Sequence, residues 1–241
     1  MKLNLYEHEL RKNKNSIIEI FGLPKSGKTS LMKELKSRGF NVALSKYQRN
    51  PNNPEDRNVV KTESTLKKTL FFLRHFLMHP WKSIYLFYKL NSNWIIIPGL
   101  NGIDYIKIGI MRNKYLAAVL GRYYLVEKMN EKIFIDEFIF QSLFMILQKK
   151  SDEKEIKRVL RCLPEAYKIL VIEIDKKERE RRMRKSISEG QTIILKNEYI
   201  KDRDKNQTFN YDIIKRIMDK EYGPTKKMSK KDLFKLKYSG E

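Results

Sequence analysis

The feature that most constrains the fold of this chain is a short apolar segment followed directly by a glycine-rich loop. The segment Ile17-Ile18-Glu19-Ile20-Phe21 leads into Gly22-Leu23-Pro24-Lys25-Ser26-Gly27-Lys28-Thr29, which has the GxxxxGK[ST] spacing of a phosphate-binding loop. Glycine lets the backbone close around an anion, and a helix that begins at the loop adds unpaired N–H groups and the positive end of its dipole. The pattern therefore predicts a strand, an anion-binding loop and a helix in succession.

This Walker A motif assigns a nucleotide and a metal ion to the loop. We expect Lys28 to reach the β- and γ-phosphates of ATP, and the Thr29 hydroxyl to bind Mg²⁺. ATP and Mg²⁺ are therefore the predicted cofactors. The residues predicted to bind the nucleotide are Gly22, Leu23, Pro24, Lys25, Ser26, Gly27, Lys28, Thr29 and Ser30.

A second apolar segment, Lys132-Ile133-Phe134-Ile135-Asp136-Glu137, ends in two carboxylates. The apolar run predicts a buried parallel strand. Because ligands of open α/β sheets bind at the carboxyl ends of the strands, Asp136 and Glu137 should face the same crevice as the phosphate-binding loop. We expect Asp136 to contribute to the Mg²⁺ site, either as a direct ligand or through a bound water.

The order of the predicted elements indicates an α/β fold with a parallel sheet between two layers of helices. Strands are predicted at residues 16–21, 40–45, 132–136 and 168–174, and helices at residues 28–38, 138–150, 153–162, 176–185 and 210–222. This alternation favours a three-layer α/β/α architecture.

Two further regions depart from this alternation. A helical insertion at residues 46–129 separates the second and third core strands, and we expect it to form the acceptor region. Residues 223–241 contain Pro224 and several lysines and are predicted to form a loose basic tail. No internal repeat or flexible linker interrupts the chain, so residues 1–241 are expected to form a single domain.

Composition is that of a folded protein with a cytoplasmic location. The 241 residues are 41% hydrophobic and include 12 Phe and 13 Tyr, which is ample material for a core. The single cysteine, Cys162, can form no internal disulfide, which fits a reducing compartment. Residues 1–15 are charged and lack the apolar core of a signal peptide.

The net charge of +22 favours polyanionic partners without selecting one of them. Nucleotides, nucleic acid and an anionic membrane surface all fit this charge. No basic motif interleaved with aromatic residues favours nucleic acid, which stays an open alternative. A homodimer also stays open.

Three stretches resemble the nucleoside and nucleotide kinases of the P-loop NTPases, and thymidylate kinases are the nearest family. They are Gly22 to Thr29, the strand that ends in Asp136-Glu137, and Ile169-Leu170-Val171-Ile172-Glu173-Ile174-Asp175 with the arginine-rich segment Lys176 to Lys185. The resemblance implies a P-loop NTPase fold and an ATP-dependent phosphotransferase acting on a small molecule. It also implies a lid at residues 176–205 that closes over the ATP phosphates.

The resemblance further assigns catalytic roles to arginines. Arg182 and Arg184 are the candidate lid cations, although a helix of alternating Glu and Arg also pairs with itself on a solvated face. Arg122 lies where the family carries an arginine that grips the acceptor phosphate, with Arg112 behind it. The planar guanidinium suits bidentate binding of phosphate.

Glu137 is the main departure from the family. Thymidylate kinases typically have Asp-Arg where this chain has Asp136-Glu137. A glutamate here is better placed to accept a proton from an acceptor hydroxyl, as in deoxynucleoside kinases, or from water in an ATPase. The resemblance also implies a last strand after the lid, and the sequence shows no clear apolar segment for it.

The insertion contains two predicted aromatic-rich helices, residues 69–78 and 80–90, separated at Pro80. Basic residues interrupt them too often for a membrane span. They could instead close over the acceptor site, or dock on an anionic membrane or a lipid-linked substrate. His75 and His79 have i,i+4 spacing but no evident third ligand, so they are interpreted as helix-face residues.

Other P-loop classes lack support in the sequence. A GTPase needs a guanine-reading Asn-Lys-x-Asp after a strand, and its nearest approximation is Ser229-Lys230-Lys231-Asp232, with no predicted strand before it. Two hypotheses remain. The first is an ATP-dependent kinase for a nucleoside, nucleotide, sugar or lipid-linked acceptor. The alternative is a regulatory P-loop ATPase or nucleotide-sensing module that acts on a protein, membrane or nucleic-acid partner.

Overall fold

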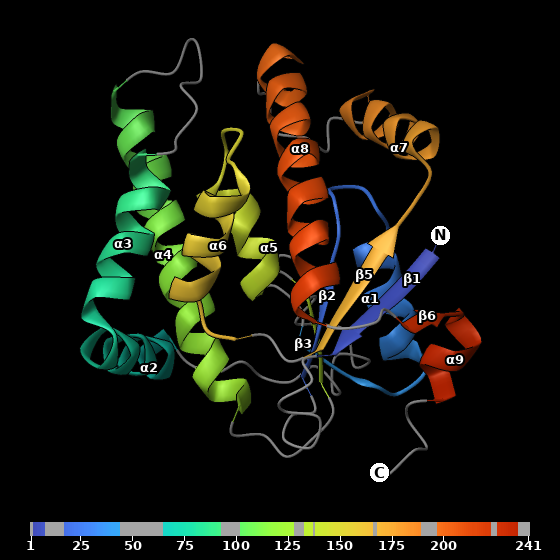
Figure 1. The fold of residues 1–241 in the computed structure, drawn as a ribbon, viewed down its shortest axis with the longest axis horizontal. Helices are drawn as coiled ribbons and strands as arrows, with labels where there is room; N and C mark the ends of the chain where they lie inside the picture. Colours follow the sequence, from blue (N-terminus) through green and yellow to red (C-terminus); the bar gives the residue numbers. More distant parts are fainter. Residues whose placement is uncertain are drawn as a thin grey trace.

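The computed structural model contains one six-stranded sheet with helices on both faces (Figure 1). It describes residues 2–7, 17–43, 65–92, 102–127, 133–136, 138–165, 168–188, 197–222 and 226–235. The strands are β1 (Lys2–Glu7), β2 (Ile17–Phe21), β3 (Asn41–Ala43), β4 (Ile133–Asp136), β5 (Lys168–Glu173) and β6 (Lys226–Met228). The helices are α1 (Lys28–Ser37), α2 (Thr65–Met78), α3 (Pro80–Ser92), α4 (Gly102–Glu127), α5 (Ile139–Ile146), α6 (Glu153–Cys162), α7 (Lys176–Ser188), α8 (Asn197–Glu221) and α9 (Lys230–Lys235). The predicted α/β class is confirmed.

The sheet is mixed, and the prediction of a parallel sheet is wrong at one side. The strand order is β3-β4-β2-β5-β1-β6. Neighbouring strands from β3 to β5 are parallel, whereas β1 pairs antiparallel with both β5 and β6. Strand β1 comes from the start of the chain, where the sequence predicted no strand. The resemblance implied a last strand after the lid, and β6 has that place in the chain, at the sheet edge beside β1.

Alternating side chains of the central strand β2 reach two separate cores. Ile18 and Ile20 pack with Leu35 of α1 on one face of the sheet, in a cluster that also includes Leu233 of α9. Ile17 and Phe21 point to the other face, where they join apolar residues of α3, α4, α5, α6 and α8. The period of two along a strand therefore places a helical layer on each face.

Helices α2, α3 and α4 lie between β3 and β4 in the chain, as the prediction of a helical insertion requires. They lie beyond α5 and α6 at the side of the molecule away from β6 (Figure 1). Leu86 and Leu90 of α3 and Leu116 and Leu120 of α4 are fully buried in the main core. The insertion is therefore packed into the same body as the sheet.

The prediction of a loose tail is wrong for residues 226–235, which form β6 and α9. Met228 and Leu233 are buried in the core beside α1. The Ser229 hydroxyl accepts from the Asp232 N–H (3.2 Å), and the Asp232 carboxylate accepts from the Ser229 N–H (3.1 Å). Segment 229–232 does follow a strand, contrary to the prediction, but Asp232 serves there to cap α9.

No helix in the described part of the chain is long and apolar enough to cross a membrane.

Candidate functional site

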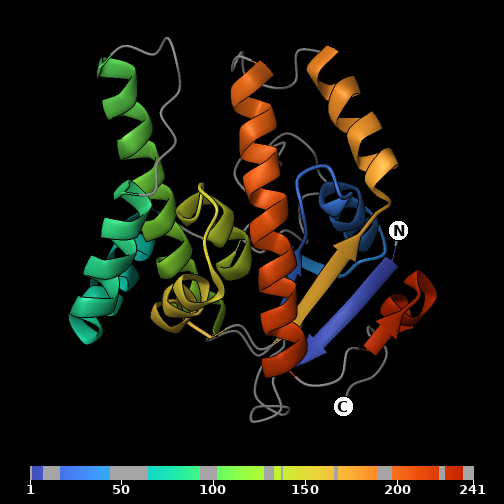
Figure 2. The same cartoon turned by 45° about the horizontal axis from the view of Figure 1, so that its top comes forward.

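Three parallel strands end at the same edge of the sheet. Ile20 of β2 pairs with Asp136, the last residue of β4, and Phe21 pairs with Val171, two residues before the end of β5. The loop that follows β2 therefore lies between Asp136 and Glu173. Figure 2 shows that α7 and α8 rise beside this edge. The structure thus brings together the phosphate-binding loop and the first predicted acid, Asp136.

The loop that joins β2 to α1 has the backbone of an anion cradle. A Cβ at Gly22 would lie 2.8 Å from the Ile172 carbonyl oxygen of β5, so glycine is required by the close approach of two backbones. Lys25 and Gly27 have positive φ angles of 64° and 104°. Gly27 precedes the first residue of α1, and its carbonyl accepts the Leu31 N–H at 3.0 Å. Tight turns of this kind turn backbone N–H groups inwards.

Lys28 begins α1, and its side chain folds back over the loop. Its Nζ atom donates to the carbonyl oxygens of Gly22 (2.7 Å) and Leu23 (3.2 Å). The ammonium group therefore lies against the loop backbone. This is a suitable position for a cation that binds a phosphate held by the loop.

Of the two predicted acids, the structure describes Asp136 but not Glu137. Asp136 is 1% exposed at the end of β4. Glu137, the predicted proton acceptor, lies outside the described residues. Asp136 is therefore placed at the site edge, and the predicted role of Glu137 stays a prediction.

A second buried carboxylate, Glu19, was not predicted as a site residue. Its Oε1 atom accepts the N–H of Gln141 at 3.0 Å, at the start of α5, whose N-terminal residue Phe138 provides no side-chain cap. Burial raises its pKa to about 8, opposed by backbone N–H groups of Gln141 and its neighbours and reinforced by the charge of Asp136. The sequence feature that could have identified Glu19 is the presence of a glutamate within an apolar strand.

A cavity of about 400 Å³ opens beside the loop, between the end of β5 and helices α7 and α8. Leu23 and Ser26 form its wall on the loop side. The opposite wall is formed by Ile172, Glu173, Ile174, Lys176, Arg179, Thr208, Tyr211 and Asp212. The Ser26 hydroxyl is buried with no hydrogen-bond partner among the described residues. The cavity thus has a mixed apolar and polar lining beside the loop, and its volume is enough for part of a nucleotide.

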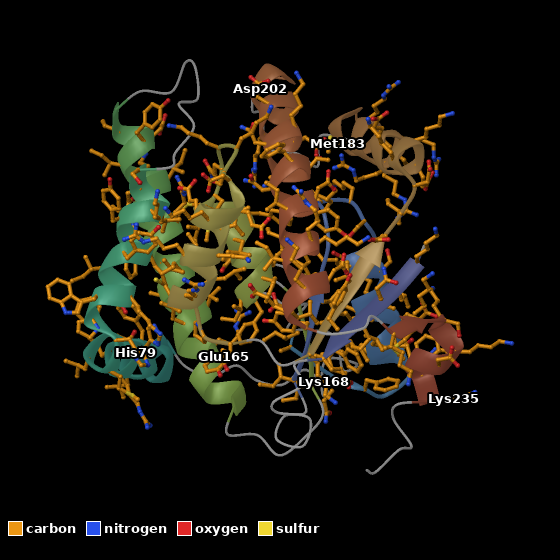
Figure 3. The ribbon with its side chains drawn as sticks, in the orientation of Figure 1. His79, Glu165, Lys168, Met183, Asp202 and Lys235 are labelled. Carbon is orange, nitrogen blue, oxygen red and sulfur yellow. The ribbon has the colours of Figure 1, made fainter. Side chains whose placement is uncertain are left out.

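Arg179 fixes α7 to α8 at this cavity. Its guanidinium donates to both carboxylate oxygens of Asp204, at 2.6 and 2.9 Å, and to the Thr208 hydroxyl at 3.3 Å. The Asp175 carboxylate accepts the Lys177 N–H (2.9 Å) at the start of α7. In Figure 3, Met183 of α7 and Asp202 of α8 mark the two helices above the sheet. Sequence reasoning missed Arg179, because nothing local distinguishes it from the other arginines of α7.

The two predicted lid cations lie on the outer part of α7. Arg182 Nε donates to Glu178 Oε1 at 2.7 Å, and Arg181 contacts the same carboxylate. Arg184 is exposed. The self-paired arrangement that the sequence offered as an alternative is therefore present for Arg182.

The two candidate acceptor arginines have different surroundings. Arg122 is half-buried on α4, and the next residue, Tyr123, stacks on Phe138 with ring centroids 6.1 Å apart. The turn that carries Arg122 thus lies beside the segment that follows Asp136. Arg112 is buried and donates to the carbonyl oxygens of Leu90 (2.7 Å) and Met145 (2.9 Å). Because it joins the ends of α3 and α5, Arg112 has a structural role.

The residues present fit a magnesium nucleotide. Mg²⁺ is usually held by phosphate oxygens, waters and one or two protein oxygens. Thr29 in the first turn of α1 and Asp136 at the end of β4 supply such oxygens. In the described ranges no group of three or more His, Cys, Asp or Glu could hold a metal ion by itself. A metal here would therefore depend on the bound phosphates.

No protein-family model, curated protein or solved structure matches the chain.

Proposed function

We propose that the chain is an ATP-binding, Mg²⁺-dependent phosphotransferase of the P-loop type, similar to nucleoside and nucleotide kinases. The observation that carries the proposal is the glycine-tight loop between β2 and α1, at the same strand edge as the buried Asp136. Phosphoryl transfer needs mainly positioning and neutralisation of charge, and this edge offers backbone donors, a lysine and a buried carboxylate.

The loop residues would bind and orient the phosphates. Backbone N–H groups within residues 22–30, other than Pro24, which has none, would hold the phosphate oxygens. Lys28 would exchange its two carbonyl contacts for the β- and γ-phosphates. Thr29 and Asp136 would hold Mg²⁺, which supplies neutralisation of the charge that develops on the transferred group. The cavity beside Leu23 and Ser26 would accept another part of the nucleotide.

The acceptor would be a small molecule with a hydroxyl or phosphate group: a nucleoside, a nucleotide, a sugar or a lipid-linked compound. Arg122 lies next to the segment that continues from Asp136, which suits a role in binding an anionic acceptor. Glu137 would take the proton of the attacking hydroxyl. Arg182 and Arg184 would approach the phosphates only if α7 moves and Arg182 leaves Glu178.

The test is release of ADP from Mg-ATP, measured with and without a panel of nucleosides, nucleoside monophosphates and sugars. We expect one class of acceptor to raise turnover well above the basal rate. Lys28→Ala should reduce this turnover by at least about 100-fold, because it removes the cation from the phosphates. Lys33→Ala is the matched control, since Lys33 is an exposed lysine of the same helix.

Two results would decide against a kinase. Equal turnover in the Lys28→Ala and Lys33→Ala variants would mean that the loop does not bind the reacting phosphates. The second result is slow ATP hydrolysis, or tight ATP binding without turnover, that no acceptor increases. If Lys28→Ala abolishes this hydrolysis or binding, the regulatory ATPase or nucleotide-sensing module is favoured.

A further inference from the structure

Exposed apolar side chains recur along α2 and α3. Within each helix they follow one another at intervals of three or four residues, which places them on one side of that helix. They are Leu70, Leu73, Leu77, Trp81, Ile84 and Tyr88, and we call this set the outer stripe. Trp81 is 82% exposed and Leu77 is 78% exposed. Large apolar side chains in a contiguous exposed set indicate an interaction surface.

The stripe continues across the junction of the two helices. The His79 N–H donates to the His75 carbonyl at 2.9 Å, and the Ser83 N–H donates to the His79 carbonyl at 3.0 Å. Helical hydrogen bonds therefore flank Pro80, which takes the first position of α3, where proline is tolerated. Although the helix axes differ in direction in Figure 1, no loop separates the two halves of the stripe.

The buried sides of α2 and α3 are already satisfied by other contacts. Ser83, Leu86 and Leu90 are buried on α3, and Phe72 of α2 packs on Phe87 with ring centroids 5.8 Å apart. The outer stripe is thus a second apolar side of helices that already have a core-facing one. A surface helix needs only one apolar side to pack on the core, so the second apolar side is not required for folding.

The charged residues of α2 and α3 themselves have one sign. Residues 65–92 contain no Asp or Glu, and their basic residues are Lys67, Lys68, Arg74, Lys82 and Lys89. Arg74 and Lys82 are exposed and lie in the sequence between members of the stripe. Lys89 is paired with Glu155 of α6 at 2.6 Å. Exposed cations interleaved with Leu, Ile and Trp are typical of helices that lie in the interface of an anionic bilayer.

We propose that the outer stripe docks on the surface of a membrane that contains anionic lipids. Leu, Ile and Trp enter the boundary between headgroups and acyl chains, and Arg74 and Lys82 contact lipid phosphates and carboxylates. A second copy of the chain is a poorer occupant, because each copy carries a net charge of +22. Nucleic acid is also a poorer occupant, because four of the six stripe residues are aliphatic and do not stack on bases.

The position of the stripe suits docking from one end of the molecule. Figure 3 labels His79 at the α2–α3 junction and Lys235 at the end of α9, on opposite sides of the molecule. Strand β6 and α9, which carry exposed Lys227 and Lys231, are therefore far from the stripe. This arrangement offers a control in which equal charge is removed at the distant end.

The test is binding of the full chain to vesicles, without nucleotide, so that the outcome is independent of phosphotransfer. One set of vesicles is phosphatidylcholine alone, and the other contains about one-third phosphatidylserine. We expect binding to the anionic vesicles that weakens with added salt. Arg74→Gln with Lys82→Gln should weaken it by about 25-fold, at about fivefold for each cation near the surface. Lys227→Gln with Lys231→Gln should weaken it by less than about threefold.

The apolar part is tested by Leu77→Ser with Trp81→Ser, which should weaken vesicle binding by more than about tenfold. The matched control is Phe209→Ser, because Phe209 is an exposed aromatic residue of α8 outside the stripe. In a Trp94→Phe background Trp81 is the only tryptophan, and its emission should shift to the blue when anionic vesicles are added. These stripe residues are exposed, so circular dichroism should report unchanged folding.

Four results would overturn the proposal. The wild type could fail to bind anionic vesicles at low salt, or the two pairs of charge variants could lose affinity equally, which would indicate general attraction by the +22 charge. Light scattering could reveal a dimer that Leu77→Ser with Trp81→Ser dissociates, which would assign the stripe to a second copy. Emission from Trp81 already shifted to the blue without vesicles would mean that another part of the chain covers it.

Discussion

Glu19 lies in the central strand with both of its strand neighbours buried, and its carboxyl group is almost inaccessible to water. Its Oε1 atom caps the start of α5 through the Gln141 N–H, which gives the carboxyl a structural partner. Loss of hydration and the nearby charge of Asp136 disfavour the ionised form and raise the pKa of Glu19 to about 8. The folded protein therefore keeps a proton that the unfolded chain releases.

Because folded and unfolded chains differ in the protonation of Glu19, the free energy of unfolding should depend on pH. The pKa of Glu19 is raised on folding from 4.5 to about 8. The stabilisation is therefore complete below the unfolded value and is lost as pH rises through the folded value. Between pH 4.5 and about 8, the free energy of unfolding should fall with rising pH by up to about 1.4 kcal/mol per pH unit. Urea titrations without nucleotide or Mg²⁺ should show that Glu19→Gln removes this slope; an unchanged slope would contradict it.

Gly22 is the residue on which the loop depends most directly. Its missing side chain leaves room for the Ile172 carbonyl of β5, which belongs to the backbone and cannot rotate away. Gly22→Ala should lower the free energy of unfolding by about 1–3 kcal/mol and weaken ATP binding, because the loop must move away from β5. Gly102→Ala is the control, since nothing lies within 4 Å of the added Cβ. Equal effects of the two substitutions would contradict the close approach.

For single residues, the sequence predicted the position of the loop between β2 and α1 and of Asp136, but not the buried carboxylate of Glu19. Spacing alone located Gly22 and Lys28, because the motif fixes backbone shape locally. Glu19 was missed, since its capping role involves a helix more than a hundred residues later in the chain. The resemblance placed Arg122 ahead of Arg112, but only the tertiary packing shows that Arg112 is bound to the carbonyl oxygens of Leu90 and Met145.

Helices α7 and α8 act as a connected pair through the ion pair of Arg179 and Asp204. The two side chains are 6% and 21% exposed, so water screens them weakly. This pair, and the Thr208 contact beside it, hold the inner part of α7 against the cavity. Any closure of α7 over a nucleotide would have to rotate about this fixed contact or break it.

We expect Arg179→Met to destabilise the fold by about 3 kcal/mol, because Asp204 is left as a largely buried charge. The double variant with Asp204→Leu should recover part of that loss. Arg181→Ala, an exposed arginine of the same helix, should change stability little. Chemical denaturation of the wild type, the single variants Arg179→Met and Asp204→Leu, and the double variant measures the coupling. If the double variant loses the sum of the two single effects, the ion pair does not couple the helices.

Helix periodicity predicted the type of most elements and fewer of their ends. Helix α8 begins at Asn197, although the sequence indicated residues 210–222. Residues 201–208 of this helix are all polar and therefore carry no apolar period. Their helical state depends on contacts such as Arg179 with Asp204, which join segments that are not neighbours in the sequence. Strand β6 was missed because its three residues include two exposed lysines.

Across the whole molecule, the first strand completes the sheet. Leu3, Leu5 and Tyr6 of β1 are buried, and the Tyr6 hydroxyl donates to Asp219 of α8 at 2.8 Å. Alternating Leu3 and Leu5 were visible in the sequence, but the charged residues around them concealed the strand. Its partners, β5 and β6, lie far along the chain, so no local pattern could predict its position.

Leu5→Ala should lower the free energy of unfolding by about 2–4 kcal/mol, because it leaves a cavity in the core between the sheet and helices α1 and α9. Lys2→Ala should have little effect, because Lys2 is exposed at the start of the strand. Thermal and urea unfolding distinguish the two cases. If residues 2–7 were a detached arm, both substitutions would leave stability unchanged.

The place of β1 has a consequence for how the protein is made. Residues 2–7 leave the ribosome well before their partners, residues 168–173 and 226–228. Strand β1 must therefore wait, unpaired, until those two segments have been synthesised. Native sheet formation is then a late event of biosynthesis, and a chain that stalls before β5 would expose Leu3 and Leu5 to the quality-control machinery of the cell.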